Sequence, residues 1–449
     1  MSTRGAGSRS APDFHKVSTR GSARGTGGGL QTTRVAAGIF YGWWIVAASF
    51  LILLITVGIG LYVPPVFLVP LQDHFGWSRA GIAAGSALAA AAAGAFSPLV
   101  GVWIDRYGSR KVMTVGALVM GGAFASFGLV QSLWQFYAIN IVAAGGISCV
   151  AWIPNQTLIA NWFERKRGLA MGIALAGIGF GGLSMAPFAD FLIGRLGWRM
   201  AFAALASLVL VVVVGVIAAL VRTQPADLGL RPDGEPSVAP GTGAGDEPAA
   251  GDGDPRNGLT LAASLRTGAF WLLSTCNLLA MFASMSVIVH LVAFLRDAGF
   301  ESGAAATALG LTIGASVAGR VVFGYLADRF AKRAIMAAAM LVYGAASACL
   351  LGIHAPAALP AFVVLFGMGL GGAAVLVPLL VGECFGLEAF GRILGLIMIS
   401  ATLGAAVGPV LTGRIFDVTG SYQSAFFVHI GCFCAAALVI ASLRTPRRG

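Results

Sequence analysis

The sequence predicts an all-α membrane protein in which twelve transmembrane helices form two parallel six-helix repeats. Three observations indicate this fold class: charged residues are scarce, apolar residues come in runs of membrane-spanning length, and a charged motif after the second run recurs after the eighth. Of the 449 residues, 57% are hydrophobic and 10% are charged, whereas a soluble protein carries about 25% charged residues. This composition excludes an ordinary water-soluble domain.

The apolar runs have the length that a helix needs to cross a bilayer. Residues Ile39 to Val63, Ala203 to Val221 and Ala361 to Val381 contain no charged side chain. About 20 apolar residues span the hydrocarbon core as a helix. We place twelve such runs, with centres near residues 52, 92, 121, 145, 180, 211, 282, 315, 343, 370, 402 and 432.

Composition divides the rest of the chain into tails and a linker. Residues 1–38 are rich in Gly, Ser and Arg and lack an amphipathic apolar face. We therefore expect a disordered cytoplasmic tail, although its composition resembles a mitochondrial transit peptide. No small-residue cleavage site follows the first apolar run, so we expect that run to be retained as a span. Residues 223–267 are rich in Pro, Gly, Asp and Glu, which is typical of a flexible cytoplasmic linker. The linker separates a first six-helix bundle, residues 39–222, from a second, residues 268–444, and residues 445–449 form a cytoplasmic tail.

The net charge of +11 follows from the predicted topology. With both termini in the cytoplasm, 23 of the 29 Lys and Arg fall in cytoplasmic segments, five in outer segments and one, Arg320, within a span. Cytoplasmic loops of membrane proteins carry such an excess of positive charge. The lipid bilayer is thus the expected partner, without nucleic acid, and the expected location is the bacterial cytoplasmic (inner) membrane.

The two halves repeat a charged motif at the end of their second span. Gly101-Val-Trp-Ile-Asp105-Arg106-Tyr-Gly108-Ser-Arg110 aligns with Gly324-Tyr-Leu-Ala-Asp328-Arg329-Phe-Ala-Lys-Arg333 at a shift of 223 residues. An aspartate near a helix end accepts hydrogen bonds from neighbouring helix termini and arginines, while glycine allows backbones to approach closely. A topology signal alone explains the basic residues but not the repeated spacing of glycine and aspartate. The two copies of this motif comprise Gly101, Asp105, Arg106, Gly108, Arg110, Gly324, Asp328, Arg329 and Arg333.

These features make the chain similar to the major facilitator superfamily over about residues 39–445. The Gly-x-x-x-Asp-Arg-x-Gly-x-Arg-Lys signature of that superfamily is nearly complete from Gly101 to Lys111. The resemblance implies the major facilitator fold, with a substrate site near the bilayer midplane that is exposed alternately to the two sides. It also implies that the loop at Asp105 latches the cytoplasmic gate, and that the protein is a secondary transporter of a small molecule, not an enzyme, with no cofactor.

Two further stretches resemble the monocarboxylate porter and oxalate/formate exchanger branch of the superfamily. They are Tyr41-Gly-Trp-Trp44 at the start of the first span and Asn161-Trp-Phe-Glu-Arg-Lys-Arg-Gly-Leu-Ala-Met-Gly-Ile-Ala-Leu-Ala-Gly177 at the start of the fifth. The drug-exporter signature late in the fifth span is missing. The resemblance therefore implies that the substrate is a small organic monocarboxylate such as lactate or pyruvate.

Arg320 is the strongest candidate for binding such an anion. It lies about eight residues inside a span, or roughly 12 Å of helix, and an unpaired charge there is costly in lipid. Its planar guanidinium matches a carboxylate. In the resembling branch an arginine of the eighth helix, four residues before a glycine, binds the substrate carboxylate, and Arg320 and Gly324 keep that spacing. An internal salt bridge or a snorkelled side chain is the alternative explanation.

The sequence departs from the branch at three places. Ser316 and Pro65 stand where mammalian-type monocarboxylate porters carry an aspartate and a lysine, and Leu394 to Leu411 lacks the additional lysine of the oxalate exchanger. A single buried cation favours a monoanion over a dianion. The porters' proton-handling scheme does not transfer intact, so the expected coupling is to either protons or a counter-anion.

Three titratable residues are candidates for proton coupling, namely His290, Asp190 and Glu383. Histidine changes its charge between about pH 5 and 8. A hydrogen-bonding cap at the outer rim explains His290 equally, and gating or topology explains Asp190 and Glu383, because both lie near span ends.

Polar residues inside the spans are candidates for lining the substrate cavity. Ser316, Asn155 and Asn277 are the ones that we associate with Arg320. Interhelical packing is the alternative role for each.

Several apparent motifs carry no chemistry in this context. Gly177-x-Gly179-x-x-Gly182 and Gly367-x-Gly369-x-x-Gly372 fit the dinucleotide fingerprint, but both lie inside apolar runs without a preceding strand, so helix packing explains them better. The six cysteines show no CxxC spacing, and we expect no metal site. Transport of a larger or uncharged metabolite, and a non-transporting solute sensor, are the alternative functions.

Overall fold

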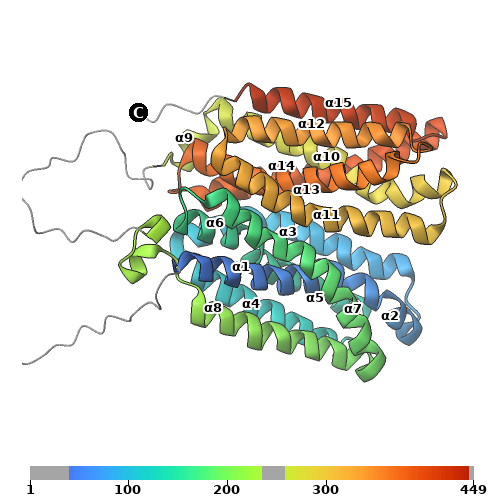
Figure 1. The fold of residues 1–449 in the computed structure, drawn as a ribbon. Helices are drawn as coiled ribbons and strands as arrows, with labels where there is room; N and C mark the ends of the chain where they lie inside the picture. Colours follow the sequence, from blue (N-terminus) through green and yellow to red (C-terminus); the bar gives the residue numbers. More distant parts are fainter. Residues whose placement is uncertain (1–39, 235–257, 444–449) are drawn as a thin grey trace, which may run out of the picture. The chain divides into compact units, whose positions relative to one another are not determined.

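Every regular element in the described parts of the chain is a helix. The computed structural model describes residues 40–234 and 258–443 (Figure 1). The predicted tail at residues 1–38, the middle of the predicted linker and the predicted tail at residues 445–449 lie outside the described residues.

The first half opens with a helix of mixed geometry. α1 (Gly42–Val57) continues through a π-helical turn, η1 (Gly58–Tyr62), and a 3-10 turn, η2 (Pro64–Phe67), into α2 (Leu68–Phe75). Pro64 and Pro65 stand in the irregular part, because proline donates no backbone hydrogen bond to a regular helix. The next helices are α3 (Arg79–Tyr107), α4 (Ser109–Phe127), α5 (Leu133–Val150) and α6 (Trp152–Trp162).

The fifth and sixth predicted spans follow each other without a loop. α7 (Arg167–Ser207) continues through η3 (Leu208–Val213) into α8 (Val214–Leu220). Gly197 interrupts α7 with φ 76° and ψ 160°, a conformation that only glycine adopts without strain. The 54 residues from Arg167 to Leu220 would measure about 80 Å as one straight helix, far more than the ~30 Å hydrocarbon core. The chain therefore turns at Gly197 and crosses the bilayer twice.

The second half is more regular. Two 3-10 turns, η4 (Pro225–Leu228) and η5 (Pro232–Gly234), precede the undescribed part of the linker, and a short helix, α9 (Leu261–Leu265), follows it. Six long helices complete the chain: α10 (Gly268–Asp297), α11 (Ser302–Arg329), α12 (Lys332–Leu351), α13 (Ala358–Phe385), α14 (Phe390–Thr419) and α15 (Gln423–Ala441).

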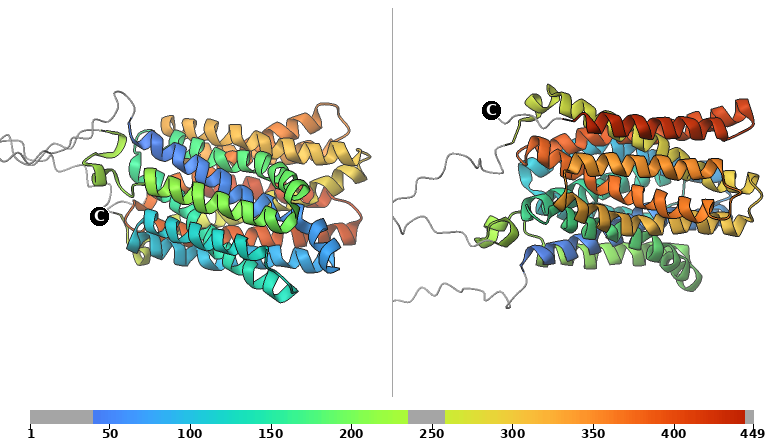
Figure 2. Two further views of the ribbon diagram at one scale, coloured as in Figure 1. Left: turned by 90° about the horizontal axis from the view of Figure 1, so that it is seen from below. Right: turned by 45° about the horizontal axis from the view of Figure 1, so that its top comes forward.

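The described helices confirm the prediction of twelve spans. Ten stretches are long and apolar enough to cross a bilayer. One of them is the stretch that Gly197 divides into two, and α4, with 19 residues, supplies the remaining span. The helices of the second half (yellow to red) run alongside those of the first half (blue to green) (Figure 1, Figure 2).

Glycines set the distances between packed helices. α7 packs against α1 within the first half, and α7 and α3 pack against α11 and α14 of the second half. A Cβ on Gly177 would collide with the backbone of Phe50 in α1, and a Cβ on Gly371 would collide with the backbone of α11 at Ser316. Small residues allow such close approach between membrane helices. The glycine-rich stretches at Gly177 and Gly367 thus lie inside α7 and α13 at packed positions.

We predict that Gly177→Ala destabilises the protein, because the added methyl group meets backbone atoms that cannot rotate away. Overpacking of this kind costs about 1–3 kcal/mol. The matched control is Gly215→Ala in α8, where an added Cβ meets no atom within 4 Å and the helix gains propensity. Thermal unfolding in detergent should show a lower midpoint for Gly177→Ala only. Equal midpoints for the two variants would contradict the packing argument.

Candidate functional site

Asp105 joins the two halves at one end of the helices. Its Oδ2 accepts a hydrogen bond from Nε of Arg392 at 2.8 Å, and the pair forms a salt bridge. The backbone N–H of Arg392 donates to the same oxygen at 3.4 Å. Arg392 lies in the first turn of α14, where the helix dipole also favours a negative charge. A carboxylate at the end of α3 therefore holds the start of α14.

Asp328 makes the corresponding contact from the second half to the first. Its Oδ1 accepts from the backbone N–H of Gly168 at 2.6 Å, and its Oδ2 accepts from that of Leu169 at 2.8 Å. Both donors lie in the first turn of α7, whose N–H groups have no partner inside the helix. The repeated motif thus forms two matching contacts, each from the end of one helix to the start of a helix in the other half. We call this end of the helices the gate end.

The glycines of the motif permit these contacts. A Cβ on Gly101 would collide with the carbonyl oxygen of Gly391, and a Cβ on Gly324 would collide with that of Gly168. Gly108 has φ 81° and ends α3, a conformation that favours glycine. Because the backbones touch at both positions, the aspartates come within reach of the opposite helix.

The arginines of the motif brace each half separately. Nη2 of Arg110 donates to the carbonyl of Ala218 at 2.8 Å, and Nη1 of Arg333 donates to that of Leu443 at 3.0 Å. These carbonyls belong to the ends of the sixth and twelfth spans. Arg106 and Arg329 lie over the rings of Tyr107 and Tyr325 at 5.4 Å and 4.3 Å. Each half therefore braces its own motif loop with contacts inside that half.

Asp233, which sequence reasoning missed, ties the start of the linker to the same region. Its Oδ2 accepts from the backbone N–H of Glu164 at 3.1 Å and of Arg165 at 2.7 Å. Asp233 has a φ of 60° and is the only non-glycine residue with a positive φ in the described chain. The loop that precedes α7 is thus bonded by Asp233, and α7 itself is bonded by Asp328. A lone aspartate in a Pro/Gly-rich stretch offers no signal of this contact in the sequence.

Arg320 lies in α11 between the two halves, away from the gate end. The residue is 5% exposed, and its Nε and Nη1 have no hydrogen-bond partner among the described residues. Nη1 would lie 3.2 Å from a Cβ on Gly179 of α7. Tyr62 in η1 and Tyr343 in α12 lie within electrostatic range of the guanidinium. In the described parts of the chain no carboxylate forms a salt bridge with Arg320, so its charge lacks a counterion there.

The other predicted substrate-binding residues are buried but bonded to backbone carbonyls. Ser316 Oγ donates to Ile313 at 2.6 Å, and Asn155 Nδ2 donates to Val150 at 2.8 Å. Asn277 Nδ2 reaches the carbonyl of Ile397 at 3.4 Å, which makes a weak contact between α10 and α14. Asn155 keeps a buried Oδ1 that has no partner among the described residues. Their roles in substrate binding stay predictions.

The three candidates for proton coupling lie in different environments. His290 is half-buried, with Nδ1 at 3.2 Å from the Tyr422 hydroxyl and Nε2 at 2.9 Å from the Pro409 carbonyl. Glu383 accepts a hydrogen bond from Nζ of Lys332 at 2.7 Å, close to the gate end. Asp190 is exposed on α7. The structure therefore does not bring the three together.

Sequence reasoning also missed two buried polar residues, Tyr343 and His429. Tyr343 is fully buried, and its hydroxyl lies beside that of Ser284 without the alignment of a hydrogen bond. His429 in α15 is 1% exposed. The available signal was the presence of a titratable side chain inside an apolar run, the same signal that identified Arg320.

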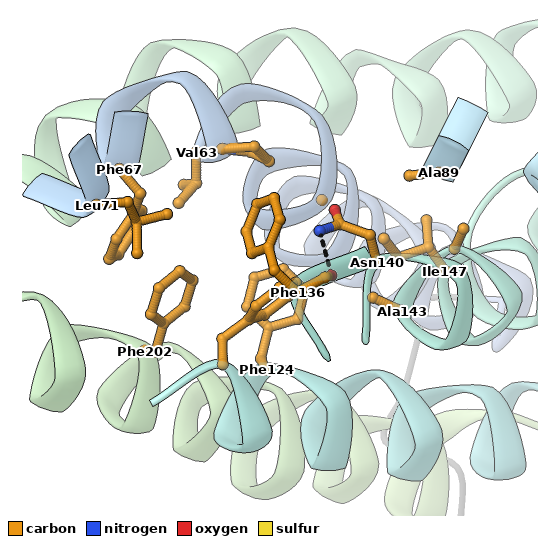
Figure 3. Close-up of a pocket in the computed structure, with 14 residues that line it drawn as sticks. Val63, Phe67, Leu71, Ala89, Phe124, Phe136, Asn140, Ala143, Ile147 and Phe202 are labelled. Carbon is orange, nitrogen blue, oxygen red and sulfur yellow. Dashed lines mark hydrogen bonds between the residues drawn. The ribbon is translucent and has the colours of Figure 1, made fainter. Parts of the chain in front are cut away.

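An apolar cavity in the first half lies apart from Arg320. It is lined by residues of η1, η2, α2, α3, α4, α5 and α7, among them Phe67, Phe124, Phe136 and Phe202 (Figure 3). Asn140 contributes a polar side chain, and its Nδ2 donates to the Phe136 carbonyl at 2.8 Å. With aromatic walls and no charged residue in its lining, this cavity is unsuited to binding an anion.

Relatives of this chain are transport proteins over most of their length. It is 28% identical over 409 residues to monocarboxylate transporter 13 of Bos taurus, which covers 90% of this chain and 89% of that protein. It is 26% identical over 401 residues to monocarboxylate transporter 2 of Rattus norvegicus, which covers 85% of this chain and 79% of that protein.

Solved structures show the same fold at low sequence identity. The fucose:proton symporter of E. coli matches with a TM-score of 0.64 and 14% identity, over 89% of this chain and 98% of that chain. The human organic anion transporter MFSD10 matches with a TM-score of 0.66 and 17% identity, over 89% and 99%. The sequence model of the Major Facilitator Superfamily matches residues 48–325 and 273–449. The chain therefore belongs to the Major Facilitator Superfamily and is a multi-pass membrane transporter, not an enzyme.

Proposed function

We propose that this protein transports a small organic monocarboxylate, such as lactate or pyruvate, across the membrane by alternating access, coupled to protons or to a counter-anion. The observation that carries this proposal is the buried guanidinium of Arg320, which has no carboxylate partner in the described chain. Relatives named as monocarboxylate transporters support the same substrate class.

The energetics of burial favour an anionic substrate at Arg320. A charge taken out of water must be paired, because an unpaired ion in a low-dielectric interior is very costly. Nε and Nη1 of the guanidinium are buried without partners among the described residues, and a carboxylate supplies the charged oxygen acceptors that a guanidinium binds most strongly. One buried cation neutralises one negative charge, so a monoanion fits this site better than a dianion.

The gate contacts supply the alternation. Asp105 holds the start of α14 and Asp328 holds the start of α7, so both contacts must break before the halves separate at the gate end. Basic residues gather there, including Arg106, Arg110 and Arg329. Positive charge favours the cytoplasmic side, and we therefore place the gate end, together with both termini, in the cytoplasm. The conformation then has its cytoplasmic side closed, with the opposite side as the route to Arg320.

We predict that Asp105→Asn slows turnover more than it weakens substrate binding. The amide keeps the shape of the side chain but loses the salt bridge to Arg392, while Arg320 is untouched. Binding of lactate and its flux should be measured on the same preparation, with Asp73→Asn, an exposed aspartate in α2, as the control. A variant that loses affinity but cycles at the normal rate would show that Asp105 acts on the binding site.

We predict that Arg320→Gln nearly abolishes transport and that Arg320→Lys weakens it, since lysine keeps the charge but lacks the planar fork. Both proteins should insert normally, because their topology depends on the other basic residues. The measurement is counterflow of labelled lactate or pyruvate in proteoliposomes, with folding checked by size-exclusion chromatography. Arg195→Gln, at an exposed arginine of α7, is the control.

Two results would overturn the monocarboxylate assignment. Wild-type transport rates in folded Arg320→Gln would leave a larger or uncharged metabolite as the better substrate. Binding of lactate by the wild-type protein without any accumulation in vesicles would indicate a solute sensor.

A further inference from the structure

Two histidines from different helices of the second half bond to the same helix, α14. His290 of α10 contacts the carbonyl of Pro409, and Nε2 of His429 of α15 lies 3.0 Å from the hydroxyl of Thr412. Pro409 and Thr412 are three residues apart, so they lie on neighbouring positions of one helix face. His290 and His429 also lie within electrostatic range of each other. They form one group around the outer half of α14.

The bonds of His290 suit a ring that takes up a proton. The Pro409 carbonyl can only accept, so Nε2 donates to it at 2.9 Å, and in the neutral ring Nδ1 accepts from the Tyr422 hydroxyl at 3.2 Å. When Nδ1 gains a proton, the Tyr422 hydroxyl rotates and its oxygen accepts. Both N–H groups of the charged ring then have oxygen partners without any movement of the backbone.

His429 has the opposite environment. The residue is 1% exposed, and its Nδ1 has no hydrogen-bond partner among the described residues. The rings of Phe282 and Phe426 lie 6.4 Å and 6.0 Å from its own ring. Leaving a buried nitrogen without a hydrogen-bond partner is destabilising. His429 thus places a buried, unpartnered ring nitrogen in the same group as the bonded ring of His290.

Few other titratable groups surround the pair. Asp297 at the end of α10 and Asp417 near the end of α14 act on Tyr422, and both are exposed, as are Arg296 and Arg414 beside them. From α12, which packs on α15, Tyr343 stacks on Phe433, one turn beyond His429. The acidic residues thus lie on the water side of Tyr422, opposite the gate end, and the histidines lie inside.

We propose that His290 and His429 form a one-proton site that couples proton binding to the position of α14. The proton enters from the outer water: Tyr422 gives its hydroxyl proton to Nδ1 of His290 and takes a replacement from water or from a protonated Asp297 or Asp417. Repulsion between two charged rings limits the pair to one proton. This inference rests on the proposed transport function and identifies its coupling ion as the proton.

α14 connects this site to the gate. The helix carries Arg392, the partner of Asp105, in its first turn and Pro409 and Thr412 further along. The 17 residues from Arg392 to Pro409 rise about 26 Å. One helix therefore connects the hydrogen bonds of the two histidines to the salt bridge at the gate end. A change in those hydrogen bonds can shift α14 and so affect the salt bridge.

The first test needs no substrate. The chain has five histidines, so protein labelled with ¹⁵N-histidine gives few ring signals, which His290→Gln and His429→Gln assign. Between about pH 5 and 8, the His290 ring should take up a proton while the His429 ring stays neutral. If neither ring titrates in that range, the proton site does not exist, whatever the protein transports.

The second test separates coupling from transport in proteoliposomes with labelled lactate. One-for-one proton coupling across about one pH unit supports about tenfold accumulation. His290→Gln and Tyr422→Phe should each lower this accumulation close to the level without a gradient, measured relative to the variant's own counterflow rate. His354→Gln, an exposed histidine in the loop after α12, should keep the wild-type ratio.

Each failure has a separate meaning. His290→Gln protein that accumulates lactate like the wild type would overturn the proton site and leave the proposed transport function in place. Wild-type protein without lactate counterflow would overturn the proposed substrate, while the titration of His290 would still decide whether the proton site exists.

Discussion

The absence of water within the bilayer determines where this protein places its charged groups and why its backbone is helical. Charged side chains of the described helices gather at the helix ends, where water or a partner is available, and the backbone is helical because every buried N–H must be bonded. Asp105 and Asp328 lie at such ends. Asp105 pairs with the charged side chain of Arg392, and Asp328 accepts hydrogen bonds from free N–H groups at the start of α7. Arg320 breaks the rule, since it is buried and its partner is not part of the described chain. The same constraint thus explains the contacts at the gate end and leaves the buried charge of Arg320 without a counterion in the described chain.

The two gate contacts are related by the internal repeat but differ in chemistry. Asp105 pairs with the side chain of Arg392, whereas Asp328 accepts only backbone N–H groups. A salt bridge near the surface weakens in high salt, while hydrogen bonds from a helix N-terminus depend less on ionic strength. Asp233 adds a third carboxylate beside Asp328, on the loop before α7. One contact is therefore a salt bridge that depends on ionic strength, and the other lies beside a further carboxylate from the start of the linker.

α14 contacts each of the separate sites. Its first turn meets Asp105, its middle packs closely on α10 at Gly404 and Gly408, and its outer half meets His290 and His429. A Cβ at either glycine would collide with the backbone of α10, so the two helices are in direct backbone contact. A closely packed helix is displaced as a unit when one of its ends shifts. A loosely packed helix would instead bend locally.

The twelve spans, the repeated motif and the burial of Arg320 were predictable from the sequence, because long apolar runs indicate membrane helices and a single charge inside such a run is conspicuous. The pairing of Asp105 with Arg392 was not, since nothing in the order of residues specifies which helix start meets which aspartate. The sequence likewise did not distinguish Gly197 from the other glycines, and only its positive φ in the structure shows that the chain turns there and divides α7 into two spans. His429 was overlooked in an apolar run, and only the packing of α15 on α14 gave it Thr412 as a partner and His290 as a neighbour. Composition and periodicity determine which segments enter the membrane, but side-chain partners come from helices far apart in the chain, so the tertiary structure alone decides them.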